Sequence, residues 1–227
     1  MEEISNILLQ ELLLNLEEHK RLHIDVTEKM TKADNAKMYP LDLMGISIAK
    51  RSMSLIKGFV EMIKQENLIC AIPLLRLQLD NSLRFYAAFL VENPHELASH
   101  FIEGEAIRRL TEKNTHKKLT DRLLVERLSE HYPWIVDVYE KTSGYIHLSD
   151  YHLFKTLNKV EPDKITAVIG DSDSYISIEE KIKTVNTMVK LTTIVLWLIN
   201  SWALTKETPN IQDWKEKNGP GTGYKVI

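Results

Sequence analysis

The chain has 227 residues, of which 44% are hydrophobic and 27% are charged, and its formal net charge is −3. These values exclude a disordered chain, suit one large domain, and give no overall attraction to nucleic-acid phosphates. Because only eight glycines and seven prolines are present, the chain has few turn-forming residues, which favours long helices over a many-stranded sandwich.

Regular apolar spacing predicts three long helices in the first part of the chain. Residues 2–32 place apolar side chains every three to four positions, which is typical of a helix with one buried face. The polar stretch 31–37, followed by Pro40, predicts a break. The second helix is predicted at 41–65 and the third, the most apolar of the three, at 68–91.

Capping signals mark the helices of the second part. The pair Asn93-Pro94 and the Ser177–Glu180 capping box each indicate a helix start. The predicted helices are 94–113, 120–130, 133–142 and 177–206. Before the last of them, the β-branched run 164–170 predicts a strand or a small hairpin.

Together these elements predict an all-α fold. We expect residues 1–206 to form a single helical bundle of five to seven helices, with a small irregular or β-hairpin insertion before the last long helix. Residues 207–227, which hold two prolines and three glycines, are expected to form a flexible C-terminal tail.

The sequence also bears on compartment. Cys70 is the only cysteine, so no intramolecular disulfide can form and a four-cysteine zinc site is excluded. The acidic start is unlike a secretory signal. The longest uncharged run, 191–205, has 15 residues, fewer than the roughly 20 that span a membrane, so it predicts a buried core helix. We therefore expect a cytoplasmic protein with no membrane partner.

Arg76, Asp80 and Arg84 are spaced by four and share one face of the predicted helix 68–91. One interpretation is a structural ladder, in which the single acid pairs with both arginines. Replacing Asp80 should then cost more stability than replacing either arginine. The other interpretation is a polar cleft, in which one arginine binds a phosphate or a carboxylate.

Residues 145–152 hold the densest group of titratable and hydroxyl side chains, namely Tyr145, His147, Ser149, Asp150, Tyr151 and His152. Histidine transfers protons near neutral pH, so His147 and His152 are candidate acid–base groups. Alternatively, Ser149 or Asp150 caps a helical turn and the histidines only pack. The segment offers too few ligands for a metal site, and we expect no cofactor.

Elsewhere the polar residues predict surface. The pair His19 and His23 is expected to be exposed. The run 108–118 is the only local basic patch and has no aromatic residue for base stacking, so we expect a solvated face. No glycine-rich phosphate loop, zinc CxxC pair, HExxH or GxSxG motif is present.

Two features carry a family resemblance: an arginine with an acid four residues later on a central apolar helix (Arg76, Asp80), and the later segment IHLSDYH. The chain resembles, over about residues 41–204, uncharacterised bacterial all-helical proteins. Some of these look related to abortive-infection proteins and to the HEPN superfamily of helical-bundle ribonucleases. The resemblance implies cleavage of RNA without metal, by attack of the 2′-hydroxyl on the adjacent phosphate. It also implies an arginine and a histidine with four to six residues between them, a spacing that Arg109 and His116 have here.

Proton transfer and charge stabilisation suggest a different assignment of the residues. The 145–152 segment follows an apolar helix that should anchor it, so we expect His147 or His152, rather than His116, to transfer the proton. Arg76 or Arg84 would be the cation that stabilises the phosphate charge. Asp80, Tyr145, Ser149 and Asp150 are the expected binding residues.

Two functions stay open at this point. The first is a HEPN-like metal-independent ribonuclease or toxin-type defence protein acting on RNA. The second is a non-catalytic helical module that binds a protein partner or a small ligand. An arginine and a histidine converging in an open basic cleft would favour the enzyme, and a closed ladder with scattered histidines would favour the module. Surplus apolar surface on the predicted helices also predicts a homodimer.

Overall fold

The computed structural model describes residues 2–146, 149, 152, 157–161, 164–167, 169–173 and 175–207. Within them the chain forms seven α-helices, so the all-α prediction is confirmed. They are α1 (Glu2–Ala36), α2 (Pro40–Lys64), α3 (Leu68–Tyr86), α4 (Pro94–Ile102), α5 (Asp121–Ser129), α6 (Ile135–Ile146) and α8 (Ile178–Glu207). Short 3₁₀ turns, η1 (Ala87–Phe89) and η2 (Ile107–Arg109), follow α3 and α4.

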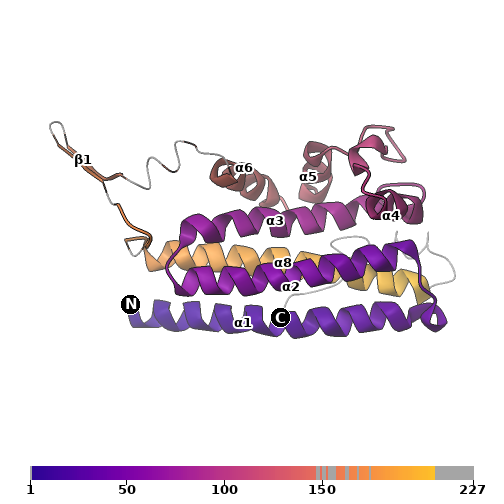
Figure 1. Ribbon diagram of the computed structural model, residues 1–227, viewed down its shortest axis with the longest axis horizontal. Coiled ribbons are helices and arrows are strands. Elements are labelled where there is room, and N and C mark those ends of the chain that lie inside the picture. Colours follow the sequence, from indigo (N-terminus) through magenta and orange to yellow (C-terminus); the bar gives the residue numbers. More distant parts are fainter. Residues whose placement is uncertain are drawn as a thin grey trace.

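Four long helices make the central bundle (Figure 1). Both α1 and α3 pack on α2 and on α8, so α2 and α8 lie between them. The helices α1 and α8 run parallel, because His19 meets Thr193 near their middle and Met30 meets Lys206 near their ends. The shorter helices α4, α5 and α6 lie over the side of the bundle that α3 forms (Figure 1).

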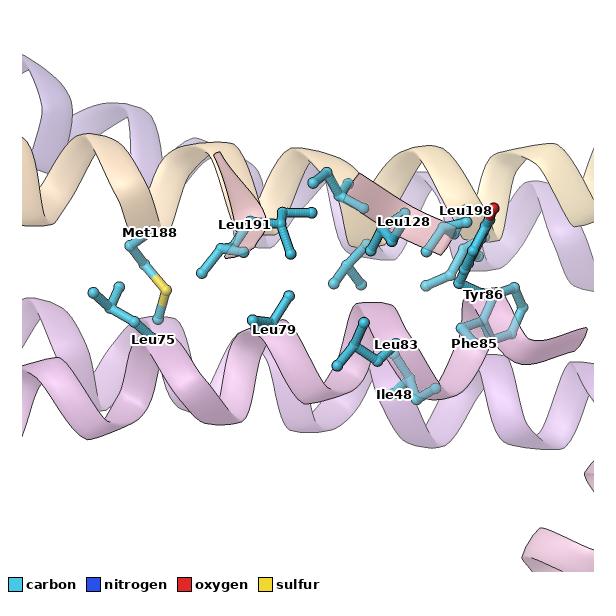
Figure 2. Close-up of a cluster of buried hydrophobic side chains, with 14 of the residues drawn as sticks. Ile48, Leu75, Leu79, Leu83, Phe85, Tyr86, Leu128, Met188, Leu191 and Leu198 are labelled. Carbon is cyan, nitrogen blue, oxygen red and sulfur yellow. The ribbon is translucent and has the colours of Figure 1, made fainter. Parts of the chain in front are cut away.

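The core between α3 and α8 follows directly from the apolar spacing. Leu75, Leu79 and Leu83 recur every four residues on α3 and point toward the apolar side chains of α8 (Figure 2). All three are at most 5% exposed. Full burial of such a side chain stabilises the fold by roughly 1.5–3 kcal/mol. On α8, the run 191–205 is buried in the bundle as predicted.

The break predicted between residues 31 and 37 is confirmed. Helical backbone angles stop at Ala33, whose ψ is 152°, and Asp34 and Asn35 have φ of 52° and 55°. Residues with short polar side chains adopt this left-handed conformation more readily than others. The helix α2 then begins at Pro40, where the missing N–H costs nothing.

At this end of the bundle an ion pair joins α2 to α8. Lys206 Nζ lies 3.0 Å from Asp42 Oδ2, and both side chains are fully enclosed. The second Asp42 oxygen accepts a 2.7 Å bond from Trp202 Nε1. Lys206 also donates to the carbonyl oxygens of Met30 and Lys37. The contact therefore ties α8 to the connection between α1 and α2.

The helix predicted at 94–113 is too long. The structure ends α4 at Ile102, because Gly104 adopts a φ of 77° that terminates the helix. After η2, Thr111 pairs with Lys118 in a small antiparallel turn. The basic run 108–118 therefore lies on a largely exposed connection and not on an α-helix.

Between α6 and α8 the structure describes two short strands. β1 (Leu157–Glu161) pairs antiparallel with β2 (Lys164–Ala167), and the pair projects beyond the bundle (Figure 1). After them, Asp173 Oδ2 accepts the backbone N–H groups of Leu68 and Ile69, so the segment before α8 caps the start of α3. The predicted tail beyond Glu207 lies outside the described residues.

Among the described helices, α8 is the one long and apolar enough to cross a membrane by length and composition. Of its most apolar window, 56% is buried against the rest of the chain.

Candidate functional site

A cleft of about 590 Å³ lies between α2, α3 and the segment that joins α4 to α5. Three arginines and three acids line it: Arg51, Arg84, Arg108, Asp80, Glu105 and Asp121. Ile48, Phe101 and Ile107 add an apolar wall. The volume falls in the range of small-molecule sites, and the lining combines apolar surface with a few convergent polar groups, as such sites do.

The line predicted on α3 forms one wall of this cleft, and its pairing differs from the prediction. Asp80 accepts a 2.9 Å bond from Arg84 Nε, as the spacing of four predicts. Its second cation is Arg51 of α2, at 3.1 Å. Arg76 bonds instead to Asp121 of α5, at 3.4 Å. The expectation of a single acid between Arg76 and Arg84 is therefore wrong.

A second acid completes the network. Asp121 accepts a 2.6 Å bond from Arg84 Nη2 through one oxygen and the bond from Arg76 through the other. Its position is fixed because Thr120 caps α5, accepting from the backbone N–H of Leu123. As the first residue of α5, Asp121 also lies where a helix favours negative charge. Two acids and three arginines thus form one connected group.

The network continues into the core. Arg51 Nη1 donates a 2.5 Å bond to Asn81 Oδ1, and Asn81 donates to Gln78. Gln78, fully buried, donates to Ser52 of α2 and Thr192 of α8. Buried polar groups are stable only when bonded in this way. The chain of bonds therefore holds Arg51 at the cleft from the centre of the bundle.

The aspartate oxygens of the cleft are already hydrogen-bonded within the protein, whereas some of its arginine N–H groups are not. Both oxygens of Asp80 and both of Asp121 already accept arginine bonds. Within the described part of the chain, Arg51 uses only Nη1, Arg84 leaves Nη1 unbonded, and Arg108 is exposed with no bond at all. Apart from Glu105, whose described contacts use Oε2, the capacity left for a ligand therefore belongs to the cations.

The remaining member of the line, Arg76, is held from two sides. Its guanidinium carbon lies 4.2 Å from the ring centre of Tyr139 on α6, a cation–π contact. Its side chain is only 12% exposed, and it is not among the residues that line the cleft. Arg76 therefore supports Asp121 and does not face a ligand.

At the edge of the cleft, Glu105 brings a histidine and an arginine together. Its Oε2 lies 2.6 Å from Nδ1 of His100 and 3.8 Å from Arg109. A carboxylate that bonds one ring nitrogen of a histidine orients the other. His100 and Glu105 were not among the predicted site residues. The sequence signal that could have identified them is their separation of five residues across the helix end at Gly104.

The pair Arg109 and His116 lies on the exposed connection. His116 has a φ of 57° and sits in the turn between Thr111 and Lys118, where its backbone N–H donates to Glu112. The partner of Arg109 is Glu105.

The 145–152 segment is described in part. Ser149 Oγ donates to the carbonyl of Gly144, and the Ser149 N–H donates to His152 Nδ1 at 3.3 Å. The ring of His152 lies 5.7 Å from that of Tyr145, at the end of α6. Arg76 and Arg84 were predicted to act as the cation beside this segment. The structure shows both of them bonded to acids of α3 and α5. His147, Asp150 and Tyr151 lie outside the described residues.

The prediction that His19 and His23 are exposed is wrong. Both are buried where α1 packs on α8, with His19 bonding Thr193. His23 donates or accepts at Nδ1 with the carbonyl of His19, while its Nε2 has no partner in the described structure. Burial lowers the pKa of His23 to about 4, so it stays neutral at physiological pH.

No group of three or more potential metal ligands lies together among the described residues.

Comparison of the chain with protein-family models, with curated proteins and with solved structures found no match.

Proposed function

We propose that the chain is a non-catalytic helical module that binds a small anionic ligand with an apolar part in the cleft between α2, α3 and α5. One observation carries the proposal: the carboxylates of Asp80 and Asp121 are occupied, whereas guanidinium N–H groups are left over. Guanidinium groups suit carboxylate and phosphate oxygens, which accept two parallel bonds. An anion therefore gains bonds from these arginines that a cation cannot form.

The apolar wall adds a second requirement. Ile48 and Ile107 are buried core residues whose edges reach the cleft, and Phe101 is partly exposed beside them. A ligand that covers this wall removes apolar surface from water, at roughly 25 cal/mol per Å². The preferred ligand therefore joins an apolar group to its anionic end.

Four small probes separate these contributions. Phenyl phosphate carries both features, inorganic phosphate only the charge, phenol only the ring, and benzylammonium the opposite charge. We expect calorimetry to rank phenyl phosphate first, inorganic phosphate second, and the other two without measurable binding. Equal binding of benzylammonium would overturn the proposal.

Arg108 and Arg122 provide the matched variants. Both are exposed arginines without a bond in the described structure, but only Arg108 lines the cleft. Arg108→Ala should weaken phenyl phosphate binding about 10-fold, the worth of one charge-assisted bond. Arg122→Ala should leave it unchanged. Equal loss in both variants would indicate general attraction by positive charge.

A second candidate is metal-independent RNA cleavage, the activity that the HEPN-like resemblance implies. The observation in its favour is that Glu105, a cleft residue, contacts both His100 and Arg109. Against it, no histidine is among the cleft-lining residues. The test is incubation of RNA without divalent metal, comparing the wild type with alanine variants of His100, His116, His147 and His152. Loss of a general acid–base group costs about 10²–10⁴ in rate. Cleavage abolished by one of these variants would replace the binding module with the enzyme.

A further inference from the structure

The cleft between α2, α3 and α5 keeps one carboxylate oxygen that its arginines do not occupy. Glu105 lines the cleft, and its described side-chain contacts, with His100 and Arg109, are both made through Oε2. Its Oε1 has no partner among the described residues, and the side chain is 38% exposed. The other acids of the lining, Asp80 and Asp121, have both oxygens bonded. Glu105 is therefore the acid of the cleft that can still accept a bond from a ligand.

This acceptor and the free arginine donors belong to different walls of the cleft. Arg51 lies on α2 and Arg84 on α3, whereas Glu105 lies on the segment between α4 and α5. Both arginines keep guanidinium N–H groups that are unbonded in the described part of the chain. A ligand held between the walls therefore meets positive charge on one side and negative charge on the other.

The apolar part of the lining is close to Glu105 along the chain. Phe101 precedes Glu105 by four residues and Ile107 follows it by two. Ile48 of α2 completes the apolar wall from the other side of the cleft. A donor group of the ligand at Glu105 thus leaves an attached apolar group beside surface that it can cover.

We propose that the ligand is a zwitterion, an α-amino acid with an apolar side chain. The inference rests on the proposed function, because the anionic group stays at the arginines and the apolar group stays at the wall. The carboxylate accepts bonds from Arg51 and Arg84, the ammonium donates to Glu105 Oε1, and the side chain covers the apolar wall. Guanidinium groups suit a carboxylate, and a bond between ammonium and carboxylate is charge-assisted.

The charge of Glu105 favours this zwitterion over a plain anion. An anion of the same shape has no donor for Glu105, so it places like charge near that carboxylate. An ammonium at the same position replaces repulsion with attraction. One charge-assisted bond is worth about 10-fold in affinity. We therefore expect the amino group of the ligand to tighten binding by about this factor.

Three ligands with the same ring separate the two charges. L-Phenylalanine carries a carboxylate and an ammonium, 3-phenylpropanoate only the carboxylate, and phenethylamine only the ammonium. Near neutral pH, calorimetry should show L-phenylalanine binding about 10-fold tighter than 3-phenylpropanoate, and phenethylamine without measurable binding.

The same measurements distinguish failure of the zwitterion from failure of the proposed function. If phenyl phosphate binds but L-phenylalanine binds no tighter than 3-phenylpropanoate, the zwitterion is wrong and the anion site stands. If phenethylamine binds as tightly as L-phenylalanine, or if none of these ligands binds, both are wrong.

Glu105→Gln tests the role of the carboxylate, because it keeps the shape of the side chain and removes its charge. It should weaken L-phenylalanine binding about 10-fold without weakening 3-phenylpropanoate binding. Glu103→Gln replaces an exposed acid two residues away that is not among the cleft-lining residues, and it should change neither affinity. Equal weakening of both ligands by Glu105→Gln would mean that Glu105 only maintains the shape of the cleft. That result, or an equal loss of L-phenylalanine binding in Glu103→Gln, overturns the proposal.

Discussion

At the scale of single residues, the two acids at the cleft share one arginine, Arg84. Arg84 bonds to both Asp80 and Asp121, while Arg51 and Arg76 each bond to one of them. Removal of any one arginine leaves both acids paired, and removal of one acid leaves Arg84 paired with the other acid but takes the carboxylate from Arg51 or Arg76. The ladder predicted from α3 alone had no such alternative, because it contained a single acid.

We therefore expect single replacements to be mild and the double replacement of the acids to be severe. Asp80→Asn and Asp121→Asn should each lower the free energy of unfolding by about 1 kcal/mol. Together they leave three guanidiniums without a carboxylate, so their combined cost should exceed the sum by at least about 1 kcal/mol. Urea denaturation of the four proteins of the cycle measures this coupling.

Glu61→Gln is the matched control, because within the described residues Glu61 forms its ion pair with Lys64 at the surface. Combined with Asp80→Asn, it should give an additive loss. Additivity of the two cleft acids as well would show that they do not share their arginines.

His23 should make stability depend on pH. Its pKa is about 4 in the folded protein, because burial disfavours the charged ring, against an ordinary value near 6.5. Between these values the unfolded chain binds a proton that the folded chain does not, so stability falls as the pH is lowered from about 6.5 to 4. The integrated loss is about 3 kcal/mol. Denaturation curves at a series of pH values should show this loss in the wild type and in His116→Leu, but not in His23→Leu.

How much of the site could be predicted depends on distance along the chain. Asp80 and Arg84 were found because one turn of one helix separates them. Arg51 and Asp121 lie 29 and 37 residues from their partners on α3, and no periodicity relates residues on different helices. The one sequence signal for Asp121 was its place next to the cap residue Thr120. For Arg51 the sequence indicated only a positive charge among the apolar residues of the helix predicted at 41–65.

At the scale of elements, apolar spacing located the long helices well and their ends less well. The third helix was predicted at 68–91, and α3 with η1 covers Leu68–Phe89. The error in α4 came from reading the polar run after Gly104 as a helical face. A glycine at a left-handed φ ends a helix regardless of the polar residues that follow it. The cap on α3 from Asp173 was missed because 105 residues separate it from Leu68.

The buried contact of Asp42 with Lys206 should stabilise the junction of α1, α2 and α8. Lys206→Met leaves Asp42 enclosed without its cation, and breaking a buried pair costs about 3–5 kcal/mol. Lys183→Met, at an exposed lysine of the same helix, should cost less than about 0.5 kcal/mol. Thermal unfolding followed by circular dichroism compares the two.

The double variant Asp42→Asn with Lys206→Met distinguishes charge from packing. If the unpaired carboxylate causes the loss, neutralising it should recover part of the stability. A double variant less stable than Lys206→Met would show that the carboxylate is stabilised by Trp202 and Tyr39 alone, which also donate to it.

At the scale of the whole molecule, the bonds from Thr192 through Gln78 to Arg51 cross three helices of the bundle and end at the cleft. The apolar contacts of α3 with α8 (Figure 2) would hold these helices together without any polar group. The chain of buried hydrogen bonds in this core therefore serves to position a side chain more than to stabilise the fold. It fixes which way Arg51 faces.

Gln78 tests this separation of position from stability. Gln78→Leu leaves Ser52, Thr192 and Asn81 without their bonds to the Gln78 amide, at about 1–3 kcal/mol for each group left unsatisfied. Adding Ser52→Ala and Thr192→Val removes two of those groups, so the triple variant should be more stable than the single one. In both variants Asn81 is no longer held by Gln78, so Arg51 loses its orientation and phenyl phosphate binding should stay weak even where stability has recovered. Urea denaturation and calorimetry on the same samples measure the two quantities. Binding that recovers together with stability would show that the core chain supports the fold alone and does not position the cleft.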